Sequence, residues 1–231
     1  MTGWLRVVGL GPGPAAWITP EVSTALAEAS DLVGYRTYLA RVTARPEQTV
    51  HASDNGDELQ RAQQALELTH AGRRVVVVSG GDPGVFAMAA AVFEAVERGP
   101  HSWRQLDVSI LPGVTAMLAA AARLGAPLGN DFCAINLSDN LKPWSIIEQR
   151  LRHASQADFV IALYNPRSQA RPELLGRALD VLRAARSDDP WVAFARAVGR
   201  PDEAMHVTQL RAADPTLVDM RTLVLIGASS T

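Results

Sequence analysis

Short apolar runs alternate with longer segments of helical periodicity along most of the chain. The runs at 5–9 and 75–78 are typical of strands, and the second is apolar on both faces, as strands of a parallel sheet are. Between them, the segment 57–71 places Leu59 and Leu66 on one face of an amphipathic helix. Strands that alternate with helices require crossover connections, so the pattern predicts an α/β fold with parallel or mixed sheets.

The alternation is interrupted at 125–131, where glycine, proline, asparagine and aspartate are concentrated. We expect a linker here, which gives an N-terminal α/β domain at 1–125 and a C-terminal α/β domain at 130–231, with one sheet in each. The other predicted elements are strands at 31–34, 107–111, 133–137, 159–164, 191–197 and 222–227, helices at 19–29, 114–124, 144–157 and 173–185, and a hairpin arm at 205–210.

The composition is that of a globular protein, with 48% hydrophobic and 20% charged residues, and no apolar run is long enough to span a bilayer. The first residues lead into a strand without a signal-peptide pattern, so we expect a cytoplasmic protein without a membrane partner. The net charge of -2 offers no general attraction to nucleic acid. One cysteine, Cys133, and five histidines without zinc-ligand spacing predict no metal site.

Three loops that follow predicted strands combine glycine with proline, at 11–14, 80–84 and 112–116. Ligands of open α/β sheets bind at the carboxyl ends of the strands, which is where these loops lie. Glycine lets a ligand approach the backbone, and proline holds a loop in one shape before binding. We therefore expect a ligand site built from these loops. In the second loop, Asp82 and Pro83 fit the N-cap and first position of a helix.

Several common nucleotide and hydrolase motifs are absent from these loops. A dinucleotide fingerprint would need glycine where Pro14 stands, and Pro12 removes an N–H group from the turn that would hold a pyrophosphate. No P-loop occurs, because the sole lysine, Lys142, follows Leu141. Val77 stands where a nucleophile elbow requires glycine. The sequence therefore argues against hydride transfer, nucleoside triphosphate hydrolysis and serine hydrolysis.

The same loops resemble the motifs of a known enzyme family. Val-Gly-Leu-Gly-Pro-Gly at 8–13, Ser-Gly-Gly-Asp-Pro at 79–83 and Pro-Gly-Val-Thr-Ala at 112–116 are similar to the three motifs of the tetrapyrrole methylases, which use S-adenosylmethionine to build sirohaem and cobalamin. The resemblance covers essentially the whole chain. In one departure, Pro14 stands where the family usually has an acidic residue after Gly-Pro-Gly.

Three further segments, at 32–39, 137–144 and 162–168, are similar to the family members that methylate C17 of precorrin-3B. The resemblance implies two α/β domains with the active-site cleft between them, a homodimer, S-adenosyl-L-methionine as the methyl donor and a tetrapyrrole substrate. The implied reaction contracts the macrocycle to precorrin-4, in which the carbon between rings A and D becomes an exocyclic acetyl group. The cobalt-containing equivalent of this substrate and methylation of another tetrapyrrole carbon remain alternatives.

Site residues follow from matching the family motifs position by position. The implied cofactor contacts are Pro12, Gly80, Gly81, Asp82, Val85, Thr115, Ala116, Asn165, Ala193 and Gly227. The substrate contacts that we expect are Gly11, Gly13, Arg36, Asp54 and Arg167.

The chemistry of the implied reaction adds candidate catalytic residues. Methyl transfer from a sulfonium is an in-line displacement that depends on orientation and needs no metal or covalent nucleophile. Ring contraction also requires a proton to move, and we assign Asp139, Lys142 and Tyr35 to this step, with His51 as a further acid–base candidate. In the structural alternatives, Asp139 or Ser138 caps the following helix, and Tyr35 belongs to the core.

Three other functions compete with this interpretation. A relative that methylates ribosomal RNA or the diphthamide precursor shares the fold, but the acidic charge balance argues against RNA. A non-catalytic corrinoid-binding protein would bind a tetrapyrrole without using S-adenosylmethionine, and the intact cofactor loops argue against it. A nicotinamide-dependent oxidoreductase would need the dinucleotide site that Pro12 and Pro14 oppose.

Overall fold

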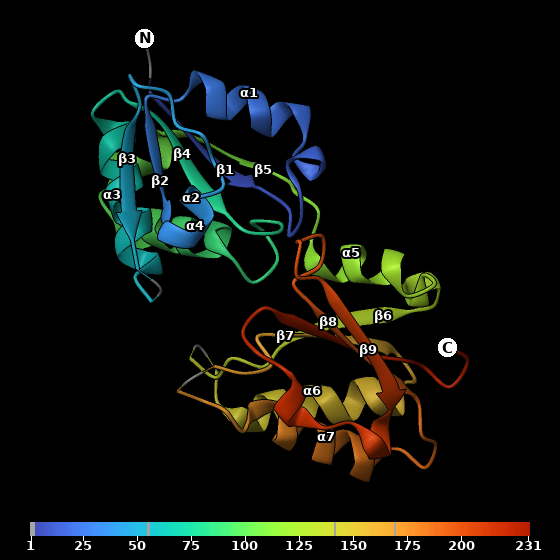
Figure 1. The fold of residues 1–231 in the computed structure, drawn as a ribbon. Helices are drawn as coiled ribbons and strands as arrows, with labels where there is room; N and C mark the ends of the chain where they lie inside the picture. The colour runs from blue at the N-terminus through green and yellow to red at the C-terminus, as the bar shows by residue number, and fades with distance from the viewer. Residues whose placement is uncertain (1–2, 55, 141, 169) are drawn as a thin grey trace. The chain divides into compact units, whose positions relative to one another are not determined.

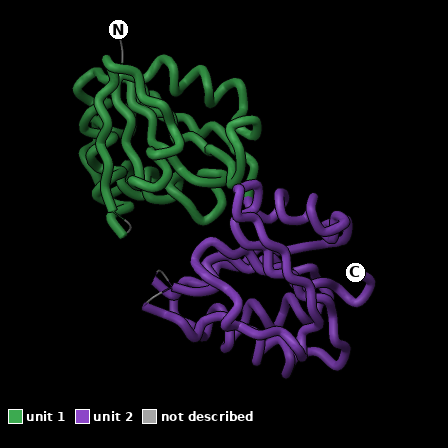
Figure 2. The backbone as a smooth tube through the Cα atoms, in the orientation of Figure 1, with its two compact units in different colours: residues 1–115 green, residues 116–231 purple. Residues whose placement is uncertain are grey.

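A computed structural model describes residues 3–54, 56–140, 142–168 and 170–231. The chain forms two compact units, Met1–Thr115 and Ala116–Thr231, which Figure 2 shows in green and purple. The division falls ahead of the segment 125–131 that the sequence predicted as the linker. The helix α5 (Ala116–Arg123) accordingly belongs to the second unit, where it contacts a strand of that unit's sheet.

The first unit contains a five-stranded parallel sheet in the order β3-β2-β4-β1-β5. Its strands are β1 (Trp4–Gly9), β2 (Asp31–Tyr35), β3 (Thr49–Ser53), β4 (Arg74–Ser79) and β5 (Asp107–Leu111). The central position of β1, with β4 on one side and β5 on the other, brings the loops that follow these three strands to the same edge of the sheet.

Helices cover both faces of this sheet (Figure 1). They are α1 (Pro20–Glu28), α2 (Arg36–Leu39), α3 (Glu58–His70) and α4 (Met88–Arg98), with 3-10 turns at Ala15–Trp17 and His101–Gln105. Val75 and Val77 of β4 pack with residues of α3 and α4, whereas Val76 and Val78 pack with residues of α1 and α2. The continuous apolar run of β4 therefore reflects burial on both faces, as the sequence predicted.

The second unit contains a mixed five-stranded sheet in the order β6-β7-β10-β8-β9. Its strands are β6 (Phe132–Asn136), β7 (Val160–Tyr164), β8 (Trp191–Arg196), β9 (Ala204–Gln209) and β10 (Thr222–Ile226). Only the β6–β7 pair is parallel, and the remaining pairs are antiparallel. The helices α6 (Trp144–Gln156) and α7 (Leu174–Ala185) contact each other and complete this unit's core (Figure 1).

The predicted α/β fold with one sheet in each half is confirmed, and the arm at 205–210 is the antiparallel strand β9. The sequence missed β3, because this edge strand is largely exposed and lacks an apolar run. It was also wrong about the loop at 80–84, since the next helix, α4, begins only at Met88. Within the described residues, no helix has both the length and the apolar character needed to cross a membrane.

Candidate active site

The loops after β1 and β4 are hydrogen-bonded to each other at the carboxyl edge of the first sheet. The Gly11 N–H donates to the Gly81 carbonyl oxygen over 3.1 Å, and the Leu10 N–H donates to the Ser79 carbonyl oxygen over 3.0 Å. A Cβ atom on Gly9 would lie 2.5 Å from the Gly81 oxygen and 2.8 Å from the Gly113 nitrogen. Glycine at position 9 is therefore required by the close approach of three backbone segments, and the three sequence motifs form one structure.

Asp82 joins the loop after β4 to the loop after β5. Its Oδ1 accepts a hydrogen bond from the Gly84 N–H over 2.8 Å, and its Oδ2 accepts one from the Gly113 N–H over 3.0 Å. The prediction that Asp82 is the N-cap of a helix is wrong, because Ala87 occupies the N-cap of α4. The carboxylate instead stabilises a turn within its own loop and fixes that loop to its neighbour.

Gly80 and Gly81 have different surroundings although they are adjacent. A Cβ atom on Gly80 would lie 2.7 Å from ring atoms of Tyr38, so this glycine is packed against an aromatic ring. Gly81 has φ +62°, and a Cβ atom there would meet only the Val114 carbonyl oxygen, at 3.9 Å. The backbone at Gly81 is thus left-handed and open to a ligand on its Cα side.

The remaining predicted cofactor residues of these loops lie nearby in the chain. Val85 is half-buried, and its N–H donates to the Asp82 carbonyl oxygen over 3.3 Å. Thr115 is buried and ends the first unit, whereas Ala116 begins α5 of the second unit. Their contacts with a cofactor stay predictions.

The side chain of Arg41 binds the first loop, and the sequence did not predict this role. Its Nη1 donates to the Gly11 carbonyl oxygen over 2.8 Å. Its Nη2 donates to the carbonyl oxygens of Leu10, over 3.0 Å, and of Gly13, over 2.9 Å. Arg41 lies about thirty residues away in the chain, and no local pattern in the sequence could have indicated these contacts.

Tyr35, Arg36 and Asp54 follow or end the neighbouring strands β2 and β3. The Tyr35 ring packs edge-on against the Tyr38 ring, with centroids 5.4 Å apart. The Arg36 Nε and Asp54 Oδ1 atoms are 3.7 Å apart, and both side chains are mostly exposed. The structure therefore brings two of the predicted substrate residues together as an exposed polar pair at the carboxyl edge of the sheet.

The buried Arg61 binds the last residue of β3 and the residue that follows it. Its Nε donates to the Ser53 hydroxyl over 2.8 Å, and its Nη2 donates to the Asp54 carbonyl oxygen over 2.7 Å. Arg61 was not among the predicted residues, because an arginine within an amphipathic helix is usually solvent-exposed. It fixes the backbone from which the Asp54 side chain projects.

His51, the further acid–base candidate, is engaged in a structural cluster instead. Its Nε2 lies 2.9 Å from Oδ1 of the buried Asp31, whose Oδ2 accepts hydrogen bonds from Arg73 Nε over 2.8 Å and from the Ser30 hydroxyl over 2.7 Å. Asp31 lies at the amino end of β2, opposite the edge that carries the glycine-rich loops. This placement assigns His51 to the packing of the sheet.

Asp139 and Arg171 form an ion pair in the second unit, between the loop after β6 and the loop after β7. Arg171 Nε and Asp139 Oδ1 are 2.8 Å apart, and both side chains are about one-third exposed. Arg171 Nη2 also donates to the Asn140 side-chain oxygen. The alternative in which Asp139 or Ser138 caps the next helix is wrong, because Pro143 occupies the N-cap of α6 without a side-chain bond.

Lys142 lies beside this pair, and the residue before it, Leu141, lies outside the described residues. The Lys142 Nζ donates to the Ser138 carbonyl oxygen over 3.3 Å. Burial and the nearby Arg150 guanidinium lower the pKa of Lys142, and the Asp139 carboxylate opposes this shift. Asp139 and Lys142 therefore influence each other electrostatically on the loop that leads to α6, and their catalytic roles stay predictions.

Two of the predicted cofactor residues of the second unit, Asn165 and Gly227, lie at opposite edges of its sheet. Asn165 follows β7, and its Nδ2 donates to the Asn136 side-chain oxygen over 3.0 Å. Gly227 follows β10, which runs antiparallel to β7, so Gly227 lies at the opposite edge of the sheet from Asn165. Ala193 is buried within β8 and pairs with Leu225. Contacts of these residues with a cofactor stay predictions.

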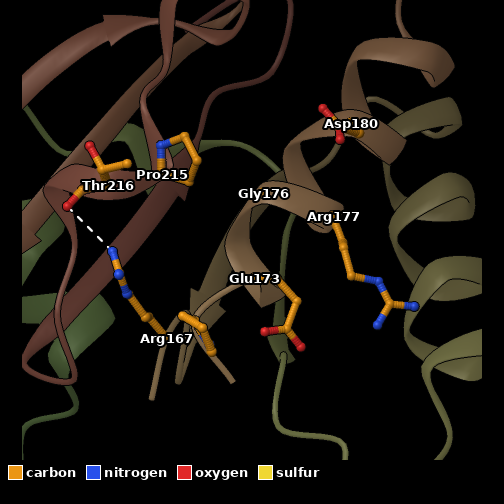
Figure 3. A pocket seen from close by; sticks show the side chains of 8 residues that line it. Arg167, Glu173, Gly176, Arg177, Asp180, Pro215 and Thr216 are labelled. Carbon is orange, nitrogen blue, oxygen red and sulfur yellow. Dashed lines mark hydrogen bonds between the residues drawn. The ribbon is translucent and has the colours of Figure 1, made fainter. Parts of the chain in front are cut away.

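Arg167 lines a surface pocket of about 320 Å³ in the second unit (Figure 3). Its Nη1 donates to the Thr216 carbonyl oxygen over 3.5 Å. Arg177, on the same pocket, places its guanidinium carbon 4.0 Å from the centroid of the Trp144 ring, and Glu173 adds a carboxylate to the lining. The lining thus mixes both signs of charge, and the role of Arg167 in substrate binding stays a prediction.

Metal-binding side chains are scattered through the described part of the chain. No group of three or more histidine, cysteine, aspartate or glutamate side chains is placed there to hold a metal ion. Burial raises the pKa of the Cys133 thiol, which disfavours the thiolate form that binds metals and attacks electrophiles.

The fold and these motifs place the chain among known enzymes. The chain belongs to the tetrapyrrole (corrin/porphyrin) methylases, whose family model matches residues 5–214. The predicted family and the predicted fold class are therefore confirmed.

Individual relatives extend the similarity over the full length. The chain is 57% identical over 231 residues to the precorrin-3B C(17)-methyltransferase of Sinorhizobium sp, covering 100% of this chain and 91% of that protein. It is 43% identical to the probable cobalt-factor III C(17)-methyltransferase of Salmonella typhimurium, covering 98% of this chain and 93% of that protein. The crystal structure of the methyltransferase CobJ superposes with a TM-score of 0.96 and 57% identity, covering 99% of this chain and 95% of that chain.

Proposed function

We propose that this chain transfers a methyl group from S-adenosylmethionine to C17 of precorrin-3B and contracts the macrocycle to precorrin-4, within corrin ring biosynthesis. The observation that carries the proposal is the linked structure of the three motif loops, in which Gly9, Gly81, Asp82 and Gly113 fix one another. The full-length similarity to a precorrin-3B C(17)-methyltransferase supports the same reaction.

The first unit supplies residues suited to hold the methyl donor. S-adenosylmethionine carries an electrophilic methyl group on a sulfonium, and transfer leaves the electron pair on sulfur while a carbon–carbon bond forms. The residues that we propose for donor contacts in this unit are Pro12, Gly80, Gly81, Asp82, Val85 and Thr115. Positive charge disappears from sulfur during transfer, so a site made mainly of backbone groups avoids stabilising the ground state by a fixed anion. The Asp82 carboxylate fits this requirement, because two backbone N–H groups already bind it.

The ring contraction requires proton transfer, and we assign it to the loop after β6. Asp139 accepts the proton, and Arg171 holds its carboxylate in one place through the 2.8 Å ion pair. Lys142 pairs with a carboxylate side chain of the substrate. Arg36 and Asp54 supply substrate contacts at the carboxyl edge of the first sheet, and Tyr35, at the end of β2, is the further candidate for proton transfer.

The cobalt-containing substrate is the second candidate, because the Salmonella typhimurium relative is named for it. Single-turnover reactions with S-adenosylmethionine and either precorrin-3B or its cobalt complex distinguish the two. We expect faster turnover of the metal-free substrate. Faster turnover of the cobalt complex would show that the cobalt-containing tetrapyrrole is the substrate. Binding of either tetrapyrrole without methylation would support a corrinoid-binding protein instead.

The family resemblance also supports a homodimer that works in the cytoplasm. Sedimentation equilibrium of the purified protein tests the oligomeric state directly. The proposal predicts a mass of twice the 24.8 kDa chain, and a mass of one chain at micromolar concentration would contradict it.

A further inference from the structure

The guanidinium of Arg41 binds backbone carbonyl groups of the first loop. Its two terminal nitrogens donate to three backbone carbonyl oxygens within four residues of the chain, those of Leu10, Gly11 and Gly13, over 2.8 to 3.0 Å. The side chain is half-buried and reaches the first loop from the segment after α2. One side chain therefore fixes the direction of the peptide groups on both sides of Pro12.

The sequence of this loop explains why it needs an outside donor. Pro12 and Pro14 have no N–H group, so the loop has few donors of its own with which to fold back on its carbonyl groups. Gly11 has φ +65°, a conformation that turns its N–H toward the Gly81 oxygen and leaves its carbonyl oxygen toward Arg41. Carbonyl groups withdrawn from water require a hydrogen-bond donor, which Arg41 supplies.

We infer that Arg41 is a positioning residue for S-adenosylmethionine: it holds residues 10–13 in their ligand-binding shape before the ligand arrives. This inference rests on the proposed function. A loop that is already ordered loses less conformational entropy on binding. The three hydrogen bonds from Arg41, which we call the Arg41 clamp, therefore raise the affinity for S-adenosylmethionine without contacting it. Arginine suits this role because its planar fork presents donors in several fixed directions and stays charged at all physiological pH values.

The replacement Arg41→Lys tests whether the Arg41 clamp depends on the geometry of the guanidinium. Lysine keeps the charge, but a single ammonium cannot reproduce the bonds that Nη1 and Nη2 make to separate carbonyl groups. Calorimetry with S-adenosylhomocysteine should show an affinity about tenfold lower than that of the wild type, the scale of losing one or two such hydrogen bonds. Methyl transfer should show a raised KM for S-adenosylmethionine and, because Gly11 and Gly13 are expected substrate contacts, also for the tetrapyrrole, with a nearly unchanged kcat.

Arg73→Lys is the matched control, because Arg73 is an arginine of the same unit that binds Asp31 at the amino end of the sheet. This variant should lower the melting temperature and leave the affinity for S-adenosylhomocysteine within about twofold of the wild-type value. Hydrogen exchange of the Gly11 N–H provides a second readout, since Arg41→Lys should accelerate it and Arg73→Lys should not.

The outcomes separate this inference from the proposed function. Failure of the wild-type protein to bind S-adenosylhomocysteine would overturn the proposed function and the inference together. Wild-type binding with unchanged affinity in a folded Arg41→Lys protein would overturn only the inference, as would an equal loss in Arg73→Lys. If Arg41→Lys does not fold, Arg41→Gln replaces it, and the same affinity and Gly11 exchange measurements decide.

Discussion

The Asp82 carboxylate and the Gly113 N–H are joined by a 3.0 Å hydrogen bond that ties the loop after β4 to the loop after β5. The two residues are far apart in the sequence but belong to loops on either side of β1. The bond connects the second and third motifs of the family and leaves the other carboxylate oxygen to hold the Gly84 N–H.

Removing this connection should loosen the proposed donor site. We expect Asp82→Ala to weaken binding of S-adenosylhomocysteine about tenfold, because two charge-assisted hydrogen bonds to the backbone are lost. Asp82→Asn keeps an acceptor oxygen and should fall between the alanine variant and the wild type. Calorimetry gives both affinities, and an alanine variant that binds like the wild type would remove Asp82 from the account.

The close approach at Gly9 gives a second prediction, this one on stability. Gly9→Ala should destabilise the first unit by about 1–3 kcal/mol, because the added Cβ atom would lie 2.5 Å from the Gly81 oxygen and force the backbone apart. Gly129→Ala is the control, since a Cβ atom there meets nothing within 4 Å. Thermal unfolding should give a lower melting temperature for Gly9→Ala than for Gly129→Ala. Equal melting temperatures would show that the loops accommodate the added Cβ atom without loss of stability.

The outline of the fold was predictable because buried strands and amphipathic helices leave periodic patterns in the sequence. The edge strand β3 was not, since exposed residues such as Thr49 and Val50 carry no such pattern. The small-residue helix α5 was recognised, but its sequence could not indicate which unit it joins.

The site was predictable where a motif is local and unpredictable where it depends on distant contacts. Asp82 followed by Pro83 fits a helix N-cap as well as a turn, and the structure decides for the turn because α4 begins only at Met88 and Asp82 binds the N–H groups of Gly84 and Gly113. The contacts of Arg41 with Gly11 and of Arg171 with Asp139 bridge about thirty residues, so no local pattern in the sequence could indicate these pairs.

Asp139 and Lys142 should affect different steps of the reaction. Asp139→Asn keeps the size of the side chain but removes the proposed base and its ion pair with Arg171, so ring contraction should slow about a hundredfold or more while cofactor binding stays nearly normal. Lys142→Ala should mainly raise KM for the tetrapyrrole. Single-turnover kinetics separates these effects, and normal contraction in Asp139→Asn would show that another group takes the proton.

The carboxylates bound by arginine make stability sensitive to acid. Burial opposes ionisation of Asp31, but hydrogen bonds from Arg73, His51 and Ser30 outweigh it and hold the pKa of Asp31 below its usual value of 3.8. A hydrogen bond from Arg221 lowers the pKa of Asp202 to about 2 against a smaller effect of burial. Because these pKa values are lower in the folded state, the stabilisation is present above about pH 4 and is lost as the pH falls toward 2.

Urea unfolding between pH 2 and pH 6 measures this dependence. Asp31→Asn should lower the unfolding midpoint near pH 6 and flatten its decline below pH 4. Asp180→Asn, which removes a carboxylate that is 75% exposed, is the control and should keep the wild-type profile. A profile of Asp31→Asn parallel to that of the wild type would contradict the assigned role of Asp31.

The most direct test of the proposed reaction follows the transferred carbon and the ring skeleton together. The protein is incubated with precorrin-3B and S-adenosylmethionine labelled with carbon-13 in its methyl group, and the product is analysed by mass spectrometry and NMR. We predict one added methyl group with the label at C17 and an unlabelled exocyclic acetyl group derived from the carbon between rings A and D. A label at any other carbon, or methylation at C17 with the ring size unchanged, would contradict it.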